Sequence, residues 1–246
     1  MSPVRTPRRW MRRLIGGVVL IVALVVGGPF VYIHFIEGKA PAPLSLSTQT
    51  STTAAAGQPA ATTTTGAAPT VSSTVDGTWD IAAGSVTGYR VKETLFGQSN
   101  TAVGRTSSIT GTITVSGTQV TAAQFSVDMT TVKSDQNERD GQFQGRIMDT
   151  ATYPTATFTL SRPIQLGSVP PPGTTVTATA TGRLTLHGTT KTVTFQVQAK
   201  RTDSTIAVSG SIPVVFADYG VDNPSGGPAT TASSGTLEFL LNLSHA

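Results

Sequence analysis

The sequence of 246 residues contains no cysteine and few charged residues, which make up only 12% of the chain. The lack of cysteine excludes disulfides, thiol nucleophiles and cysteine-ligated metals. A typical soluble domain is about one-quarter charged, so ion pairs contribute less than usual here. Threonine, serine, alanine, valine and glycine are abundant instead, a composition typical of strands, turns and disordered polar stretches.

The net charge of +4 comes from one end of the chain. Five of the 17 basic residues are arginines that lie before residue 14, and the first acidic residue is Glu37. From Gly38 onward there are 12 basic and 12 acidic residues, so the main body is neutral overall. Without a basic surface to neutralise phosphates, nucleic acid is not expected as a partner.

Residues 14–36 carry no formal charge and are long enough to cross a bilayer. As a helix they would measure about 35 Å, against a hydrocarbon thickness of about 30 Å. A cleaved signal peptide has an apolar stretch of only about 7–15 residues, so we favour an uncleaved signal anchor over that alternative. The preceding arginines predict a cytoplasmic tail at residues 1–13 and an extracytoplasmic main body. The chain is therefore expected to be a single-pass protein of the cell membrane.

Residues 37–75 are dominated by Thr, Ala, Pro and Ser, with hardly any bulky apolar side chain. Such a segment buries too little apolar surface to offset the entropy of ordering it. It is predicted to be a disordered linker between the membrane and a domain at residues 76–246.

The domain at 76–246 has apolar residues at every second position, the pattern of half-buried strands. Roughly eight or nine strands separated by Gly-containing turns predict an all-β domain. Closing such strands into an antiparallel β-barrel of about eight strands would leave no free edge. The strongest strand predictions cover 79–81, 85–94, 106–115, 124–129, 155–161, 176–186, 193–199, 206–216 and 237–243.

One stretch departs from the strand pattern and predicts a short helix from about Gln136 to Met148. Asp135 is the expected N-cap and Glu138 lies three residues later, as in a capping box. Phe143 and Ile147 follow at helical spacing.

Three motifs of the domain stand out. The first runs from Val127-Asp128-Met129 through Asp135, Arg139-Asp140 and Asp149 to Tyr153-Pro154. The second runs from Gly182 to Lys191, and the third is the opening stretch from Trp79 to Lys92. Together they resemble the YceI-like family, whose hairpin has the pattern G-x-L-T-L-x-G-x-T-K. One departure is Gly141-Gln142-Phe143, where many relatives carry His-Leu after the Arg-Asp pair.

The resemblance implies a lipocalin-like barrel that holds a polyisoprenoid or another long-chain amphiphile. The membrane anchor suggests an actinobacterial-type branch. The apolar positions expected to line the barrel are Tyr89, Val91, Phe125, Val127, Phe143, Phe158, Leu184, Leu186, Phe195, Val197, Phe239 and Leu241. At the opening of the barrel, Arg90 and Lys92 are expected beside Tyr89. The motif residues are expected to be structural: Asp128, Asp135, Arg139, Asp140, Asp149, Tyr153 and Pro154.

The sequence contains no P-loop, no nucleophile elbow and no pair of histidines at metal-ligand spacing. Neither enzymatic activity nor a cofactor or metal is therefore expected. Whether the barrel interior is open or filled does not follow from the sequence. Several residues expected to face inward are small, such as Ala178, Ala180, Gly182 and Gly210. They could border a lengthwise void or fit the taper of a filled core. Two functions remain: a carrier for one apolar chain, or a cell-envelope structural or interaction domain with a filled barrel and no ligand.

Overall fold

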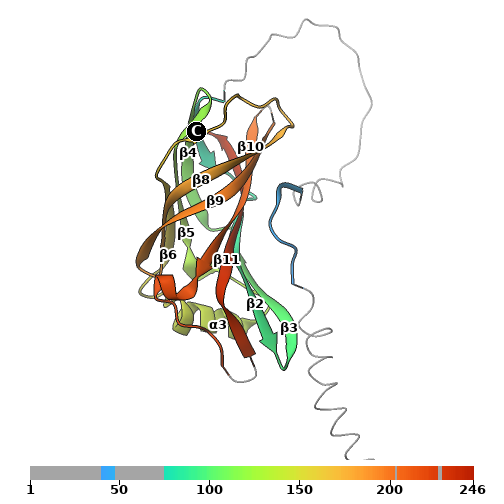
Figure 1. The fold of residues 1–246 in the computed structure, drawn as a ribbon, viewed down its shortest axis with the longest axis vertical. Helices are drawn as coiled ribbons and strands as arrows, with labels where there is room; N and C mark the ends of the chain where they lie inside the picture. The colour runs from blue at the N-terminus through green and yellow to red at the C-terminus, as the bar shows by residue number, and fades with distance from the viewer. Residues whose placement is uncertain (1–39, 48–74, 203, 227–228) are drawn as a thin grey trace, which may run out of the picture.

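The structure is a computed structural model that describes residues 40–47, 75–202, 204–226 and 229–246. The predicted cytoplasmic tail, the predicted signal anchor and most of the predicted linker lie outside the described residues. Within the described part, no helix is long and apolar enough to cross a membrane. Residues 40–47 lie inside the range predicted to be disordered, yet they have a defined position against the barrel (Figure 1).

The described domain consists of eleven strands and four short helical segments. The strands are β1 Gly77–Ile81, β2 Val86–Leu95, β3 Gln98–Thr106, β4 Ile109–Ser116, β5 Gln119–Asp128, β6 Thr155–Leu160, β7 Ile164–Gln165, β8 Thr175–Leu186, β9 Thr189–Arg201, β10 Thr205–Val215 and β11 Ala229–His245. The helical segments are η4 Met129–Thr131, α3 Asn137–Gln142, η5 Phe143–Ile147 and η6 Phe216–Tyr219.

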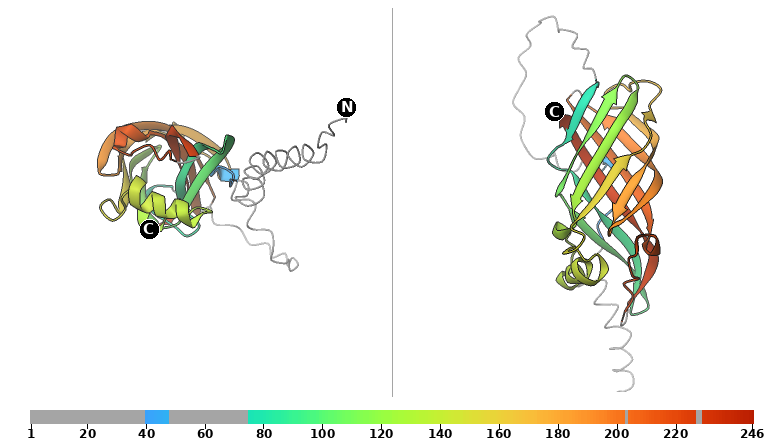
Figure 2. Two further views of the ribbon diagram at one scale, coloured as in Figure 1. Left: turned by 90° about the horizontal axis from the view of Figure 1, so that it is seen from below. Right: turned by 90° about the vertical axis from the view of Figure 1, so that its left-hand side faces the viewer.

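Eight antiparallel strands form a closed ring in the order β1-β4-β5-β6-β8-β9-β10-β11. The last residues of β11 close the ring, because Leu243 to His245 pair with Ile81 to Trp79 of β1. Figure 2 shows the ring seen along the barrel and from the side. The β2–β3 hairpin extends the sheet from the earlier part of β11. The expected all-β antiparallel barrel with one short helix is confirmed.

The period of two in the sequence explains which side chains face inward. On β8, Ala180, Leu184 and Leu186 are buried in the interior. The intervening threonines lie outside, where Thr185 and Thr190 share a hydrogen bond of 2.8 Å between their hydroxyl oxygens. The strands thus have one apolar and one hydroxyl-bearing face, which suits a sheet that closes on itself.

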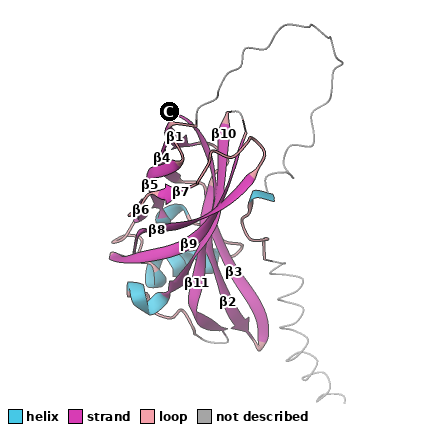
Figure 3. Cartoon of the chain, turned by 45° about the horizontal axis from the view of Figure 1, so that its top comes forward, coloured by secondary structure: helices cyan, strands magenta, loops and turns pink. Residues whose placement is uncertain are grey.

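The buried apolar residues form two clusters at opposite ends of the barrel. The larger one includes Phe143 and Met148 and lies at the end that carries α3 and η5, which we call the helix end. The smaller one is built around Trp79 and Leu243 and lies at the far end, beside the C-terminus. Figure 3 shows the helical segments and the C-terminus at these opposite ends.

The short helix lies where the sequence predicted it, but its N-cap differs. The α-helix α3 continues directly into the π-helical turn η5, so together they cover Asn137 to Ile147. The N-cap is Gln136, which makes no side-chain capping hydrogen bond, so the prediction of Asp135 as N-cap was wrong. Asp135 instead pairs with Arg139 one turn later, which satisfies its carboxylate away from the helix terminus.

Candidate functional site

The interior of the barrel holds two apolar cavities. The larger, which we call the first chamber, has a volume of about 290 Å³ and reaches the helix end. Eleven of the twelve residues predicted to line the barrel border it. They are Tyr89, Val91, Phe125, Val127, Phe143, Phe158, Leu184, Leu186, Phe195, Phe239 and Leu241.

The smaller cavity, the second chamber, has a volume of about 120 Å³ and lies toward the far end. Its lining includes Val197, the twelfth predicted residue, and the small side chains of Ala178, Ala180 and Ala199. The two chambers share Leu241 and four phenylalanines as lining residues. The barrel therefore contains an interrupted cavity, an arrangement between the open tunnel and the filled core that the sequence left undecided.

The four phenylalanines form a layer between the chambers, the phenylalanine layer of Phe125, Phe158, Phe195 and Phe239. The rings of Phe125 and Phe158 are stacked with centroids 6.4 Å apart. Phe195 meets Phe158 edge-on at 5.5 Å and Phe239 at 6.0 Å. These distances lie within the usual range for attractive aromatic pairs, so the rings stabilise one another.

Glycines on neighbouring strands make room for this layer. Gly210 pairs directly with Phe239, and a Cβ atom at Gly210 would lie 2.5 Å from the Phe239 Cζ atom. A Cβ atom at Gly182 would lie 2.3 Å from the Phe158 Cζ atom. The small inward residues therefore have two roles. Glycines accommodate the aromatic rings, whereas alanines border the second chamber.

The opening of the first chamber carries its charged side chains. This rim contains Glu93, Arg139, Gln142 and Arg146. Arg139 donates to the Glu93 carboxylate over 3.2 Å, and Arg146 donates through Nε to the Gln142 side-chain oxygen over 3.0 Å. Apolar walls with a few polar groups at one end are typical of sites for amphiphilic ligands.

Tyr89 connects the rim with the apolar interior. Its ring stacks on Phe143 with centroids 5.0 Å apart, which joins β2 to the first residue of η5. Burial raises the pKa of the Tyr89 hydroxyl well above its ordinary value, despite the opposing charge of Arg139. The hydroxyl is therefore neutral at physiological pH, so Tyr89 offers a hydrogen bond but no charge.

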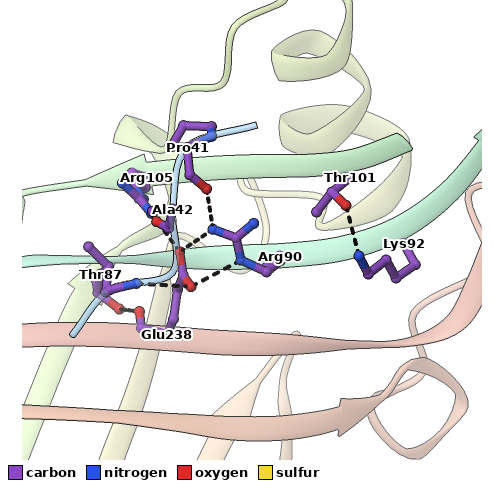
Figure 4. Close-up of polar contacts among 9 residues, drawn as sticks. Pro41, Ala42, Thr87, Arg90, Lys92, Thr101, Arg105 and Glu238 are labelled. Atoms are coloured by element: carbon purple, nitrogen blue, oxygen red, sulfur yellow. Dashed lines mark hydrogen bonds and ion pairs between the residues drawn. The ribbon is translucent and has the colours of Figure 1, made fainter. Parts of the chain in front are cut away.

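Arg90 and Lys92, expected beside Tyr89 at the opening, do not line the first chamber; both line a groove outside it, together with Glu93. They alternate along β2 with Tyr89 and Val91, and a period of two places them on the outer face. Figure 4 shows Arg90 bound to Glu238 and Lys92 donating to the Thr101 hydroxyl over 3.2 Å.

The family-motif aspartates form local hydrogen bonds that organise the helix end. The Asp128 carboxylate caps η4 by accepting from the Thr130 backbone N–H over 2.9 Å. Asp140 is buried, and its Oδ1 atom accepts from both the backbone N–H and the hydroxyl of Ser134, each over 2.7 Å. Asp149 has a left-handed backbone with a φ of 39°, which turns the chain after η5.

The remaining motif residues connect this turn to the barrel. The Tyr153 ring lies edge-on to His187 at a centroid distance of 4.5 Å. The Pro154 carbonyl accepts from the Met129 backbone N–H over 2.8 Å. Arg139 links Asp135 to Glu93 of β2 and so fixes the helix against the barrel.

Replacing Asp140 by alanine is expected to lower the free energy of unfolding by about 1–3 kcal/mol, because the Ser134 backbone N–H loses its acceptor and the Ser134 hydroxyl keeps only the Gln136 carbonyl. Guanidinium unfolding curves measure the change. Glu138→Ala is the matched control, since Glu138 is exposed on the same helix and a surface change alters stability by only about 0.5 kcal/mol. Equal stability of the two variants would contradict a structural role for Asp140.

Sequence reasoning missed several residues of the first chamber. Ile212 and Val214 line the chamber from β10, a strand that was predicted. The alternation of apolar residues along this strand already indicated that both side chains face inward. Ala102 lies on β3. Because this strand was not predicted, there was no reason in the sequence to place Ala102 in the lining of the chamber. The rim residues Gln142 and Arg146 look like ordinary exposed helix positions in the sequence.

Among the described residues, no group of three or more His, Asp or Glu side chains is placed to hold a metal ion. At the rim, Arg139 instead pairs with the Glu93 and Asp135 carboxylates. Arg146 donates to the Gln142 side chain and to the Pro224 carbonyl.

Residues 58–243 match the YceI-like domain, so the chain belongs to the YceI-like family. No curated protein gives a significant match. Two solved structures share the fold. A polyisoprenoid binding domain from Saccharophagus degradans, implicated in plant cell wall breakdown, is 20% identical with a TM-score of 0.57, covering 69% of this chain and 98% of its own. BcnA from Burkholderia cenocepacia is 22% identical with a TM-score of 0.53, covering 66% and 98% respectively.

Proposed function

We propose that the protein is a membrane-tethered, extracytoplasmic binding protein that holds one long-chain apolar ligand, a polyisoprenoid or similar amphiphile, inside its barrel. The observation that carries the proposal is the first chamber, whose apolar walls end in a polar rim at the helix end. A hydrocarbon chain would lie in the chamber, and its polar group would meet Arg139, Gln142 or Arg146 at the rim.

The energetics favour a ligand recognised mainly by its chain. Each methylene moved from water into the chamber contributes about 0.8 kcal/mol, so a chain of ten or so carbons needs few polar contacts. The ordering of a flexible chain opposes part of this gain. Affinity is therefore expected to depend more on chain length than on chain chemistry.

The Saccharophagus degradans domain, with the same fold, is described as polyisoprenoid binding, which supports this ligand class for the present chain. The proposed tether rests on the uncharged residues 14–36 and on the arginines that precede them. No catalytic step is part of the proposal. An envelope domain that acts only through its surface is the competing function, and it predicts that no chain binds in the barrel.

A tryptophan at Val127 is expected to weaken binding, because Val127 borders the first chamber on β5. If the indole displaces two methylenes of the ligand, binding weakens about 15-fold. Calorimetric titration with a length series of isoprenoids and fatty amides measures the change. The control is Gln124→Trp, an exposed position on the outer face of the same strand, which should retain full affinity. Wild-type protein that binds no member of the series would favour the competing function.

A further inference from the structure

Glu238 is a buried carboxylate on the outer face of the barrel, where a charge would ordinarily be solvated. Its side chain is only 3% exposed, although it alternates with the inward-facing Phe239 on β11. Two arginines surround it: Arg90 Nε lies 3.2 Å from Oε2, and Arg105 Nη2 lies 2.9 Å from Oε1. We call these three residues the Glu238 cluster.

Residues 40–47, which we call the strap, cover this cluster (Figure 4). Arg90 donates to the Pro41 carbonyl over 2.6 Å, and Arg105 donates to the Ala42 carbonyl. The Leu44 backbone N–H donates to Glu238 Oε2 over 3.3 Å. The same guanidinium groups thus bind the carboxylate and the strap, so the cluster recognises main-chain atoms of residues 41–44.

The composition of the strap suits this mode of binding. Pro41 and Pro43 have no backbone N–H, so the strap cannot extend the sheet as an ordinary edge strand. Proline also favours an extended backbone whose carbonyls remain free to accept. Carbonyl-to-arginine bonds and the single Leu44 N–H therefore replace a strand ladder.

The strap lies beside the opening of the first chamber. A groove between the strap and the β2–β3 hairpin is lined by Ala40 and by Glu93 and Thr231. Glu93 and Thr231 also line the first chamber. The strap therefore begins at Ala40 beside the β2–β3 hairpin (Figure 1).

We propose that the Glu238 cluster is an intramolecular docking site for residues 41–44 that holds the open, helix end of the barrel against the lipid surface. The proposal rests on the membrane tether of the proposed function. Only three residues lie between Ala40 and the end of the predicted span at Ile36, and the four Cα-to-Cα steps from Ile36 to Ala40 reach at most about 14 Å. An undocked linker of about 38 residues would have a typical span of about 35 Å. Docking therefore allows the hydrocarbon chain of a ligand to pass between the bilayer and the first chamber with little exposure to water.

Two insertions of the same Gly/Ser segment into the full chain test the proposal. One lies between Glu37 and Gly38, before the strap, and the other between Gly57 and Gln58, after it. Because the native chain has no cysteine, a donor dye can be attached to Glu138→Cys at the helix end or to Thr118→Cys at the far end. Energy transfer to an acceptor lipid in reconstituted vesicles then reports the distance of each end from the bilayer.

In the otherwise native chain, transfer from residue 138 should exceed transfer from residue 118. The insertion before the strap should lower transfer from residue 138, whereas the insertion after it should leave transfer unchanged. Equal effects of both insertions, or no effect of either, would overturn the proposal. A chain that fails to float with vesicles would refute the tether, and with it this proposal, while leaving calorimetric ligand binding to be judged separately.

A point substitution provides an independent readout. Leu44→Pro removes the N–H that donates to Glu238, and Leu44→Ala retains it. Only Leu44→Pro should lower transfer from residue 138, and it should do so without changing the stability of the barrel. The same transfer in both variants would count against docking through this contact.

Discussion

Replacing Phe195 by alanine is expected to join the two chambers and to shift ligand preference toward longer chains. Phe195 is 7% exposed and contacts both Phe158 and Phe239 in the phenylalanine layer. Removing its ring opens a path from the first chamber into the second. Each further methylene that enters contributes about 0.8 kcal/mol, which tightens binding about fourfold per carbon until the second chamber is full.

The same substitution should destabilise the ligand-free protein. Phe-to-Ala changes in well-packed cores lower the free energy of unfolding by about 3–5 kcal/mol. If the adjoining chambers already leave part of the ring unpacked, the loss in the ligand-free protein should be smaller. Calorimetry across a chain-length series and thermal melts with and without ligand separate the two effects. Val197→Ala is the control, because it enlarges the second chamber without opening the layer. An unchanged optimum of chain length in Phe195→Ala would contradict the role of the layer.

Replacing Glu238 by alanine is expected to lower the free energy of unfolding by about 3 kcal/mol. Removing one partner of a buried ion pair ordinarily destabilises by about 3–5 kcal/mol, because the remaining charge is uncompensated. We expect a loss at the lower end of this range, because the side chains of Arg90 and Arg105 are 18% and 26% exposed and so retain some solvation. Urea unfolding measures the change.

Glu238→Gln serves as the companion variant for this prediction. It preserves the shape and two acceptor sites on one oxygen but leaves the arginines without a neutralising charge, so an intermediate loss is expected. If Glu238→Ala were as stable as the native protein, the carboxylate would not hold β2, β3 and β11 together on this face.

Strong alternation of apolar residues allowed most of the barrel to be predicted, but β3 was missed for a physical reason. The β2–β3 hairpin turns at Phe96-Gly97, and both residues have positive φ values, 49° and 78°. Such turns favour Asn or Asp at the first position, so Phe96 gave no turn signal. The adjacent buried residues Ala102 and Val103 also break the alternation of β3.

The lining of the barrel followed from alternation, whereas the phenylalanine layer did not. Alternation predicts that Phe125 and Phe158 face inward, but only strand register places them opposite each other. The strap was equally beyond sequence reasoning. Its low-complexity composition offers no apolar face, and its position depends on Arg90 and Arg105, which are distant in the chain.

Mass spectrometry of organic extracts tests the central claim, that the barrel holds one long-chain apolar ligand, most directly. The full chain and its Val127→Trp variant would be purified in parallel from the same membranes, so that lipid bound to the anchor is common to both. A long-chain isoprenoid or similar amphiphile, present near one equivalent in the native protein and depleted in the variant, is the predicted result. Extracts that are free of such a molecule, or that contain it equally in both proteins, would contradict the account.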